Sequence, residues 1–155
     1  MQDRAPQSSR EKAHAAMLRE ERLGAIAVLT LTRPDARNSL SLDLLEALQV
    51  AIDRLSVDRT VSAVVLAATG PAFCAGHDLK ELAAHRTDDD RGRAFYRLTM
   101  DRCAAVMTSI LRAPKPFIAA VEGVATAAGF QLVATGDLAV AGAAARFPTP
   151  GVNIG

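Results

Sequence analysis

The chain contains no tryptophan, and only 4% of its residues are aromatic. Because platforms that stack nucleic-acid bases are built from aromatic side chains, this scarcity argues against single-stranded nucleic-acid binding. An excess of either charge is lacking as well: 18 Lys and Arg residues are balanced by 17 Asp and Glu residues, which leaves a formal net charge of +1. A protein that binds nucleic acid electrostatically carries a basic excess. Nucleic acid is therefore not an expected partner.

Cysteine and long apolar runs are also scarce. The two cysteines, Cys74 and Cys103, do not have the spacing of metal ligands, so we expect reduced thiols and no bound metal. No apolar run approaches the length of a membrane span, and we expect no membrane partner. The first residues are polar and charged without an apolar stretch, and their acidic members are atypical of a transit peptide. These features predict a cytoplasmic protein.

What the chain does contain is an alternation of strand-like apolar runs with helical periodicity. Residues 1–22 are polar and of mixed charge, and they predict an extension, with a short helix near 13–19, ahead of one core domain at 23–155. We expect strands at 23–32, 61–68, 117–121 and 137–141, and helices at 41–55, 78–84, 95–111 and 126–135. Pro34 and Asn38 mark a turn at 33–38, Ser41 is expected to cap the 41–55 helix, which has apolar residues at helical spacing, and Glu81 is expected on the exposed face of the 78–84 helix. The apolar face of the 95–111 helix is expected to consist of Phe95, Leu98, Val106, Met107, Ile110 and Leu111. Buried strands that alternate with helices predict an α/β fold with parallel strand pairing.

Two segments combine a strand, small residues and the start of a helix. In the first, residues 71–82, an apolar strand breaks into Pro and Gly and a helix begins at Asp78. The second, residues 122–132, repeats this pattern about fifty residues later. Such breaks leave backbone N–H groups free to face a cleft, where they can stabilise a negative charge that develops on oxygen. Two convergent loops of this kind are what an oxyanion hole requires.

Three motifs in this chain, at residues 37–40, 73–82 and 123–132, resemble in order and spacing those of the enoyl-CoA hydratase/isomerase (crotonase) superfamily. The resemblance covers roughly residues 22–155 and implies a crotonase-like spiral of ββα units. His77 within residues 75–82, together with 125–129 and 148–155, narrows the resemblance to one branch of the superfamily.

The resemblance implies an acyl-CoA thioester as partner, held with its carbonyl oxygen between the backbone N–H groups of His77 and Ala128. CoA is then part of the substrate, and no separate cofactor and no metal are implied. Gln131 is a candidate for orienting the substrate or a water. The implied substrate-binding positions are Arg37, Ser39, Leu40, Ala75, Gly76, His77, Asp78, Leu79 and Ala127.

The sequence departs from the family pattern at both glutamates that would flank the substrate double bond. These positions hold Gln131 and Gly151. A glutamine can orient a water but cannot take its proton, and a positioned general acid or base contributes about 10²–10⁴-fold. Hydration is therefore doubtful. The function that the resemblance then implies is stabilisation of a thioester enolate in fatty-acid or related acyl-CoA metabolism. The alternatives are a non-catalytic acyl-CoA-binding scaffold or an inactive fragment.

The chain also ends at Gly155, whereas the family pattern continues into C-terminal helices. We expect that this helical portion, which the resemblance implies for the homotrimer or dimer of trimers of a full-length parent, is missing.

For four residues of the first and second motifs, a purely structural role is an alternative to a functional one. The His77 imidazole is a candidate base, but a role for its backbone N–H alone is favoured. Arg37 suits a CoA phosphate and equally a surface turn. Asp78 at a helix start is expected to be an N-cap rather than an acid, and Cys74 a small buried residue rather than a reactive thiol.

Overall fold

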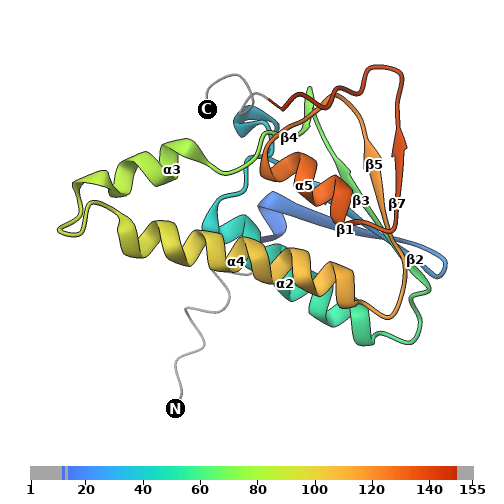
Figure 1. The fold of residues 1–155 in the computed structure, drawn as a ribbon. Helices are drawn as coiled ribbons and strands as arrows, with labels where there is room; N and C mark the ends of the chain where they lie inside the picture. The colour runs from blue at the N-terminus through green and yellow to red at the C-terminus, as the bar shows by residue number, and fades with distance from the viewer. Residues whose placement is uncertain (1–11, 13, 150–155) are drawn as a thin grey trace, which may run out of the picture.

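The structure is a computed structural model that describes residue 12 and residues 14–149 (Figure 1). Its helices and strands follow one another in this order: β1 (Leu18–Leu23), β2 (Ile26–Leu31), the 3₁₀ turn η1 (Pro34–Ala36), α2 (Leu42–Val57), β3 (Ala63–Ala68), β4 (Ala72–Cys74), α3 (Leu79–Ala84), the 3₁₀ turn η2 (His85–Thr87), α4 (Arg93–Arg112), β5 (Phe117–Val121), β6 (Val124–Ala125), α5 (Ala128–Thr135) and β7 (Leu138–Ala141). Among the described residues, no helix is both long enough and apolar enough to cross a membrane.

A five-stranded sheet in the order β1-β2-β3-β5-β7 forms the centre of the molecule. β2, β3, β5 and β7 pair in parallel, and only β1 runs antiparallel to its neighbour β2. Parallel neighbours need a crossover between them, and α2, α4 and α5 lie in the three crossovers. The predicted α/β fold with parallel pairing is confirmed.

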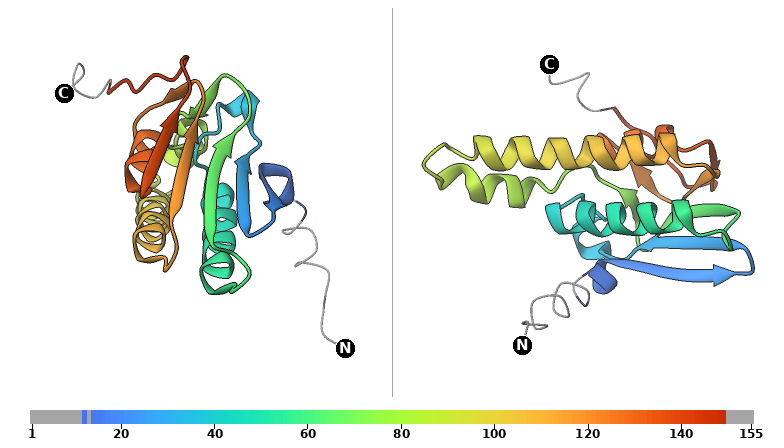
Figure 2. Two further views of the ribbon diagram at one scale, coloured as in Figure 1. Left: turned by 90° about the vertical axis from the view of Figure 1, so that its right-hand side faces the viewer. Right: turned by 90° about the horizontal axis from the view of Figure 1, so that it is seen from below.

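Helices α2, α4 and α5 lie on one face of this sheet, with α2 and α4 side by side (Figure 2). Side chains alternate along each strand, so one set points toward the helices and is buried. This set forms the core with the inner faces of α2 and α4, and its sheet members are Ala27, Leu29, Leu31, Val64, Leu66, Phe117, Ala119 and Val121.

Helix α2 begins where the sequence places its cap. The Oγ atom of Ser41 accepts a hydrogen bond from the N–H of Leu44 at 3.3 Å, which satisfies one of the donors that a helix start leaves free. The buried apolar residues of α4 lie in the C-terminal half of the helix. Its C-terminal half packs against the core, whereas its N-terminal half and α3 form an arm that projects from the sheet (Figure 1).

The predicted apolar face of α4 is therefore only partly buried. Val106, Met107 and Ile110 are buried as expected, but Leu98 and Leu111 are exposed. Thr99 and Cys103 take buried positions instead.

β1 corrects the expectation of an extension through residue 22. Residues 18–23 form an edge strand whose apolar residues stand only at its ends, with four charged residues between them. Because strand recognition depends on apolar alternation, this strand carried no signal. The boundary at residue 22 falls inside β1, and most of residues 1–13 lie outside the described residues.

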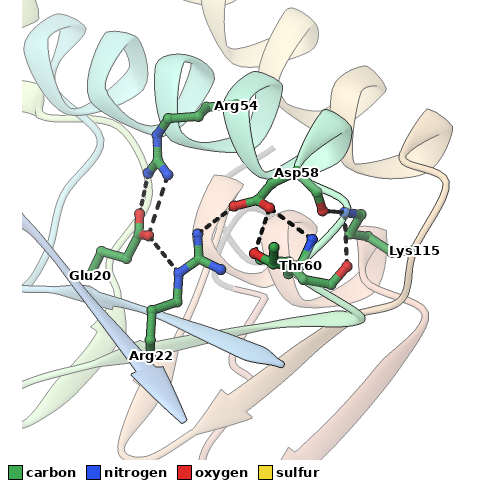
Figure 3. A network of polar contacts seen from close by, with 7 residues as sticks. Glu20, Arg22, Arg54, Asp58, Thr60 and Lys115 are labelled. Carbon is green, nitrogen blue, oxygen red and sulfur yellow. Dashed lines mark hydrogen bonds and ion pairs between the residues drawn. The ribbon is translucent and has the colours of Figure 1, made fainter. Parts of the chain in front are cut away.

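Polar contacts hold this edge strand against α2 (Figure 3). Glu20 contacts Arg54 of α2 and accepts a hydrogen bond from Arg22 at 3.1 Å. Arg22 also donates to Asp58 at 2.8 Å, and Lys115 donates to the backbone carbonyl of Asp58 at 2.7 Å. The network connects β1, the end of α2 and the start of β5. Since exposed ion pairs are individually weak, its members act as a group.

Candidate active site

The turn after β2 is held in place by Asn38, a residue whose role the sequence did not reveal. Asn38 is fully buried and has a positive φ of 51°. Its Oδ1 accepts the N–H of Arg33 at 2.8 Å, and its Nδ2 donates to the carbonyls of Thr69 and Ala72, each at 2.8 Å. One side chain thus joins the turn to the loop that follows β3. In the sequence, Asn38 signalled only a turn.

Arg33 connects the same turn to the start of α3. Its guanidinium donates to the carbonyl of Ser39 at 2.7 Å, to Oγ of Ser41 at 3.0 Å and to Oδ2 of Asp78 at 3.1 Å. This fork links the turn, the start of α2 and the start of α3. Sequence reasoning did not single out Arg33, because its partners lie up to 45 residues away.

Asp78 is the N-cap of α3, as predicted. Its carboxylate accepts the N–H groups of Lys80 and Glu81 at 3.2 Å, as well as Arg33 and the Ser39 hydroxyl. Burial alone would raise its pKa, but the hydrogen bonds from Glu81, Arg33 and Ser39 outweigh burial and lower it. The carboxylate oxygens are therefore engaged within the fold.

Glu81 is more constrained than the exposed helix residue that was expected. Its Oε2 accepts the N–H of Leu42, the first residue of α2, at 2.9 Å. Burial raises its pKa although this hydrogen bond opposes the change. Glu81 thus joins α3 to the start of α2.

A single bridge at Leu40 orients the backbone of His77. The N–H of Leu40 donates to the carbonyl of Gly76 at 2.8 Å, and the carbonyl of Leu40 accepts the N–H of Asp78 at 3.0 Å. In a parallel bridge of this pattern, the residue between the two partners turns its own N–H and C=O to the opposite side. The N–H of His77 therefore points away from Leu40.

The second loop approaches the first at Gly76. A Cβ atom at Gly76 would lie 2.9 Å from the Cβ of Ala127 and 3.3 Å from the backbone nitrogen of Ala128. The loops are also joined by the N–H of Thr126, which donates to the carbonyl of Cys74 at 3.1 Å. The structure thus brings the two predicted donor segments together. Within residues 14–149, the N–H groups of His77 and Ala128 donate no hydrogen bond.

Ala127 has an unusual backbone conformation, with φ 50° and ψ −128° at the N-cap of α5 (Ala128–Thr135). Non-glycine residues seldom adopt a positive φ, and such strain is often found at functional sites. Here it directs the chain from β6 into α5, so that the N–H of Ala128 is at the first position of the helix. Helix starts leave this donor free.

A cleft of about 1030 Å³ lies beside the first loop, between the 33–41 turn and the start of α3. Leu40, Gly76 and Ala127 do not line it: Leu40 and Gly76 are buried behind it, and Ala127 belongs to the second loop. Arg37 is exposed at its edge and has no ion pair among the described residues. Of the predicted substrate-binding residues, those that do line it are Arg37, Ser39, Ala75, His77, Asp78 and Leu79.

The His77 imidazole is half-buried, and its Nε2 has no hydrogen-bond partner among the described residues. Burial lowers its pKa. Cys74, by contrast, is fully buried, and burial raises the pKa of its thiol to about 11, as expected for a small buried residue. In the described part of the chain, no group of His, Cys, Asp or Glu side chains could hold a metal ion.

Gln131 lies on α5, one turn after Ala127, with its side chain exposed. Its placement on the same helix as Ala128 is compatible with an orienting role. Gly151, the second position without a glutamate, lies outside the described residues.

A family model described as enoyl-CoA hydratase/isomerase matches residues 21–155. The chain belongs to the enoyl-CoA hydratase/isomerase family. Human "Enoyl-CoA hydratase domain-containing protein 3, mitochondrial" is 41% identical over 133 residues, which cover 86% of this chain and 42% of that protein. The domain-containing protein 3 branch is the one to which residues 75–82, 125–129 and 148–155 narrowed the resemblance.

Solved structures confirm the crotonase fold of this family member. An enoyl-CoA hydratase from Mycobacterium smegmatis superposes with a TM-score of 0.82 and 50% sequence identity, over 90% of this chain and 52% of that chain. The human domain-containing protein 3 gives a TM-score of 0.80 at 38% identity, over 89% and 53% of the two chains. The chain spans about half the length of the curated relatives it matches.

The predicted cytoplasmic location is wrong. The human, Xenopus laevis and mouse relatives of the domain-containing protein 3 branch are all named mitochondrial. The prediction depended on acidic residues near the N-terminus, and the composition of so short a segment does not decide the compartment of a folded domain.

Proposed function

We propose that this family member binds an acyl-CoA thioester, with the thioester carbonyl oxygen between the N–H groups of His77 and Ala128. The observation that supports this most is the approach of the two loops at Gly76, where a Cβ would lie 3.3 Å from the Ala128 nitrogen. Among the described residues, both N–H groups are without an acceptor. Two fixed donors of this kind stabilise an enolate oxygen more than a ground-state carbonyl.

The cleft beside His77 would take the CoA portion of the ligand. Arg37 at its edge is exposed and has no ion pair among the described residues, so its guanidinium is available to a phosphate. The substrate would carry CoA itself, and the proposal requires no other cofactor and no metal. For a full-length parent we propose the homotrimer or dimer of trimers that the family resemblance implies.

Enolate stabilisation without hydration is the chemistry that these residues support best. The exposed side chain of Gln131 stands where the family pattern has a glutamate, and an amide cannot take a proton from water at neutral pH. The same observation favours the second candidate function, a non-catalytic acyl-CoA-binding protein. Both functions share the carbonyl contact and differ in turnover.

Calorimetric titration with crotonyl-CoA, and with free CoA as the control, tests the shared part. We expect crotonyl-CoA to bind more tightly than CoA, because only the thioester can reach the two donors. Equal affinities would reduce the function to recognition of the nucleotide end, and absence of binding would contradict the proposal. Exchange of the α-protons of butyryl-CoA for deuterium in D₂O, which reports enolate formation, separates an enzyme from a binding protein.

A further inference from the structure

The helix α3 and the N-terminal half of α4 form the projecting arm (Figure 1). Residues of both helices line a second hollow of about 760 Å³. We call it the arm groove. It is within the size range of small-molecule sites. Much of its lining is apolar and comes from both helices: Leu79, Leu82 and Ala83 of α3, and Tyr96 and Met100 of α4.

Four arginines complete the lining of the arm groove: Arg86, Arg91, Arg93 and Arg97. Among the described residues, none of them has an ion-pair partner. The loop before α4 carries Asp88, Asp89 and Asp90, and none of these three lines the groove. Asp101 is the single carboxylate of the lining, and Asp90 accepts the N–H groups of Gly92 at 2.9 Å and Ala94 at 2.7 Å. The groove therefore combines an apolar surface with an excess of guanidinium groups.

The arm groove and the cleft beside His77 meet at Leu79, which lines both. Leu79 is the first residue of α3 and follows His77 by two positions. Arg86 follows Leu79 by seven residues along α3 and the 3₁₀ turn η2, which corresponds to roughly 10 Å at the rise of a helix. A medium-length acyl chain that leaves a thioester at His77 could span this distance.

We propose that the arm groove binds the distal part of the acyl chain and selects chains that end in a carboxylate. The ligand class is then an acyl-CoA whose far end is anionic, an ω-carboxyacyl-CoA. Methylene groups would lie against Leu82, Tyr96 and Met100, and the terminal carboxylate would accept hydrogen bonds from the arginine forks, which match carboxylate geometry. This inference rests on the proposed function, because the proposed thioester site sets where the acyl chain begins.

The test compares octanedioyl-CoA with octanoyl-CoA by calorimetry, with free CoA as the reference. The two thioesters have the same number of acyl carbons and differ in the terminal carboxylate. We expect octanedioyl-CoA to bind about tenfold more tightly than octanoyl-CoA, as charge-assisted hydrogen bonds would give. In the double variant Arg86→Gln/Arg97→Gln this preference should disappear while the affinity for octanoyl-CoA stays unchanged.

A matched control is Arg102→Gln/Arg112→Gln, which removes two positive charges from α4 outside the groove lining. The control should keep the preference. Equal affinities of the two thioesters in the unmodified chain, or a preference that survives in the groove variant, would overturn the inference. If octanoyl-CoA binds no better than CoA, the proposed thioester contact fails. A preference for octanedioyl-CoA over octanoyl-CoA that is lost only in the groove variant would still support the arm groove.

Discussion

Two side chains, Asn38 and Arg33, determine the geometry of the candidate site. Asn38 lies within the 37–40 motif, and Arg33 lies outside all three motifs. Asn38 links the 33–38 turn to the carbonyls of Thr69 and Ala72, and Arg33 links it to Ser39 and Asp78. Both act through contacts between segments that are distant in sequence. Local patterns contain no information on such contacts, so sequence reasoning found the motifs and missed the contacts that hold them together.

At the residue scale, Cys74 offers a test of the packing behind the first loop. Burial raises the pKa of its thiol from 9.0 to about 11. The folded chain therefore keeps a proton that the unfolded chain loses, so this contribution to the free energy of unfolding is complete below pH 9 and falls as the pH rises toward 11. The difference of two units corresponds to roughly 3 kcal/mol.

The measurement is chemical unfolding between pH 8 and pH 10.5, compared with a Cys74→Ala variant that should lack this part of the decline. In a Cys103→Ala background, Cys74 is the single thiol and should react with Ellman's reagent at pH 9 only when the chain unfolds. Reaction at the rate of a free thiol in the folded chain would show that the loop is open.

At the scale of elements, the sequence predicted best where periodicity is long. The helix after Ser41 was expected from its cap and its apolar spacing, and the structure confirms it. Besides β1, the strands β4 and β6 were not predicted, and these two pair in parallel as a separate small sheet. They have three and two residues, too few for a pattern of alternation to show. They nevertheless bring the two donor loops together.

Helix α5 approaches β4 at a point where only glycine fits. A Cβ at Gly129 would lie 2.1 Å from the carbonyl oxygen of Cys74. We expect Gly129→Ala to displace the start of α5 and to lower the free energy of unfolding by about 1–3 kcal/mol, the usual cost of overpacking. Thioester affinity should fall with it, because Ala128 moves too.

Thermal unfolding and crotonyl-CoA titration of this variant check the prediction. Ala134→Ser, on the exposed side of the same helix, is the control and should cost no more than about 0.5 kcal/mol. A Gly129→Ala variant as stable as the unmodified chain would show that α5 and β4 are not in close contact.

At the scale of the whole molecule, several large apolar side chains remain exposed at the sheet edge and on the helices. Leu138 and Val140 of the edge strand β7 are 62% and 65% exposed, and Val57 and Leu111 are more exposed still. An edge strand also presents unpaired backbone groups, and such edges favour association between chains. The chain spans about half the length of the curated relatives it matches.

We therefore expect this chain to associate in a concentration-dependent manner in sedimentation velocity experiments. The double variant Leu138→Lys/Val140→Lys should remain monomeric at concentrations where the unmodified chain associates, because lysine on an edge strand opposes pairing. An unmodified chain that stays monomeric over the whole accessible range would contradict the prediction.

The central claim is that two backbone N–H groups recognise a thioester carbonyl. Calorimetric titration with butyryl-CoA and with S-butyl-CoA, the thioether that has the same chain without the carbonyl oxygen, tests it most directly. Because two hydrogen bonds depend on that oxygen, butyryl-CoA should bind at least about tenfold more tightly. Equal affinities for the thioester and the thioether would contradict the claim, since the carbonyl would then have no donors in this chain.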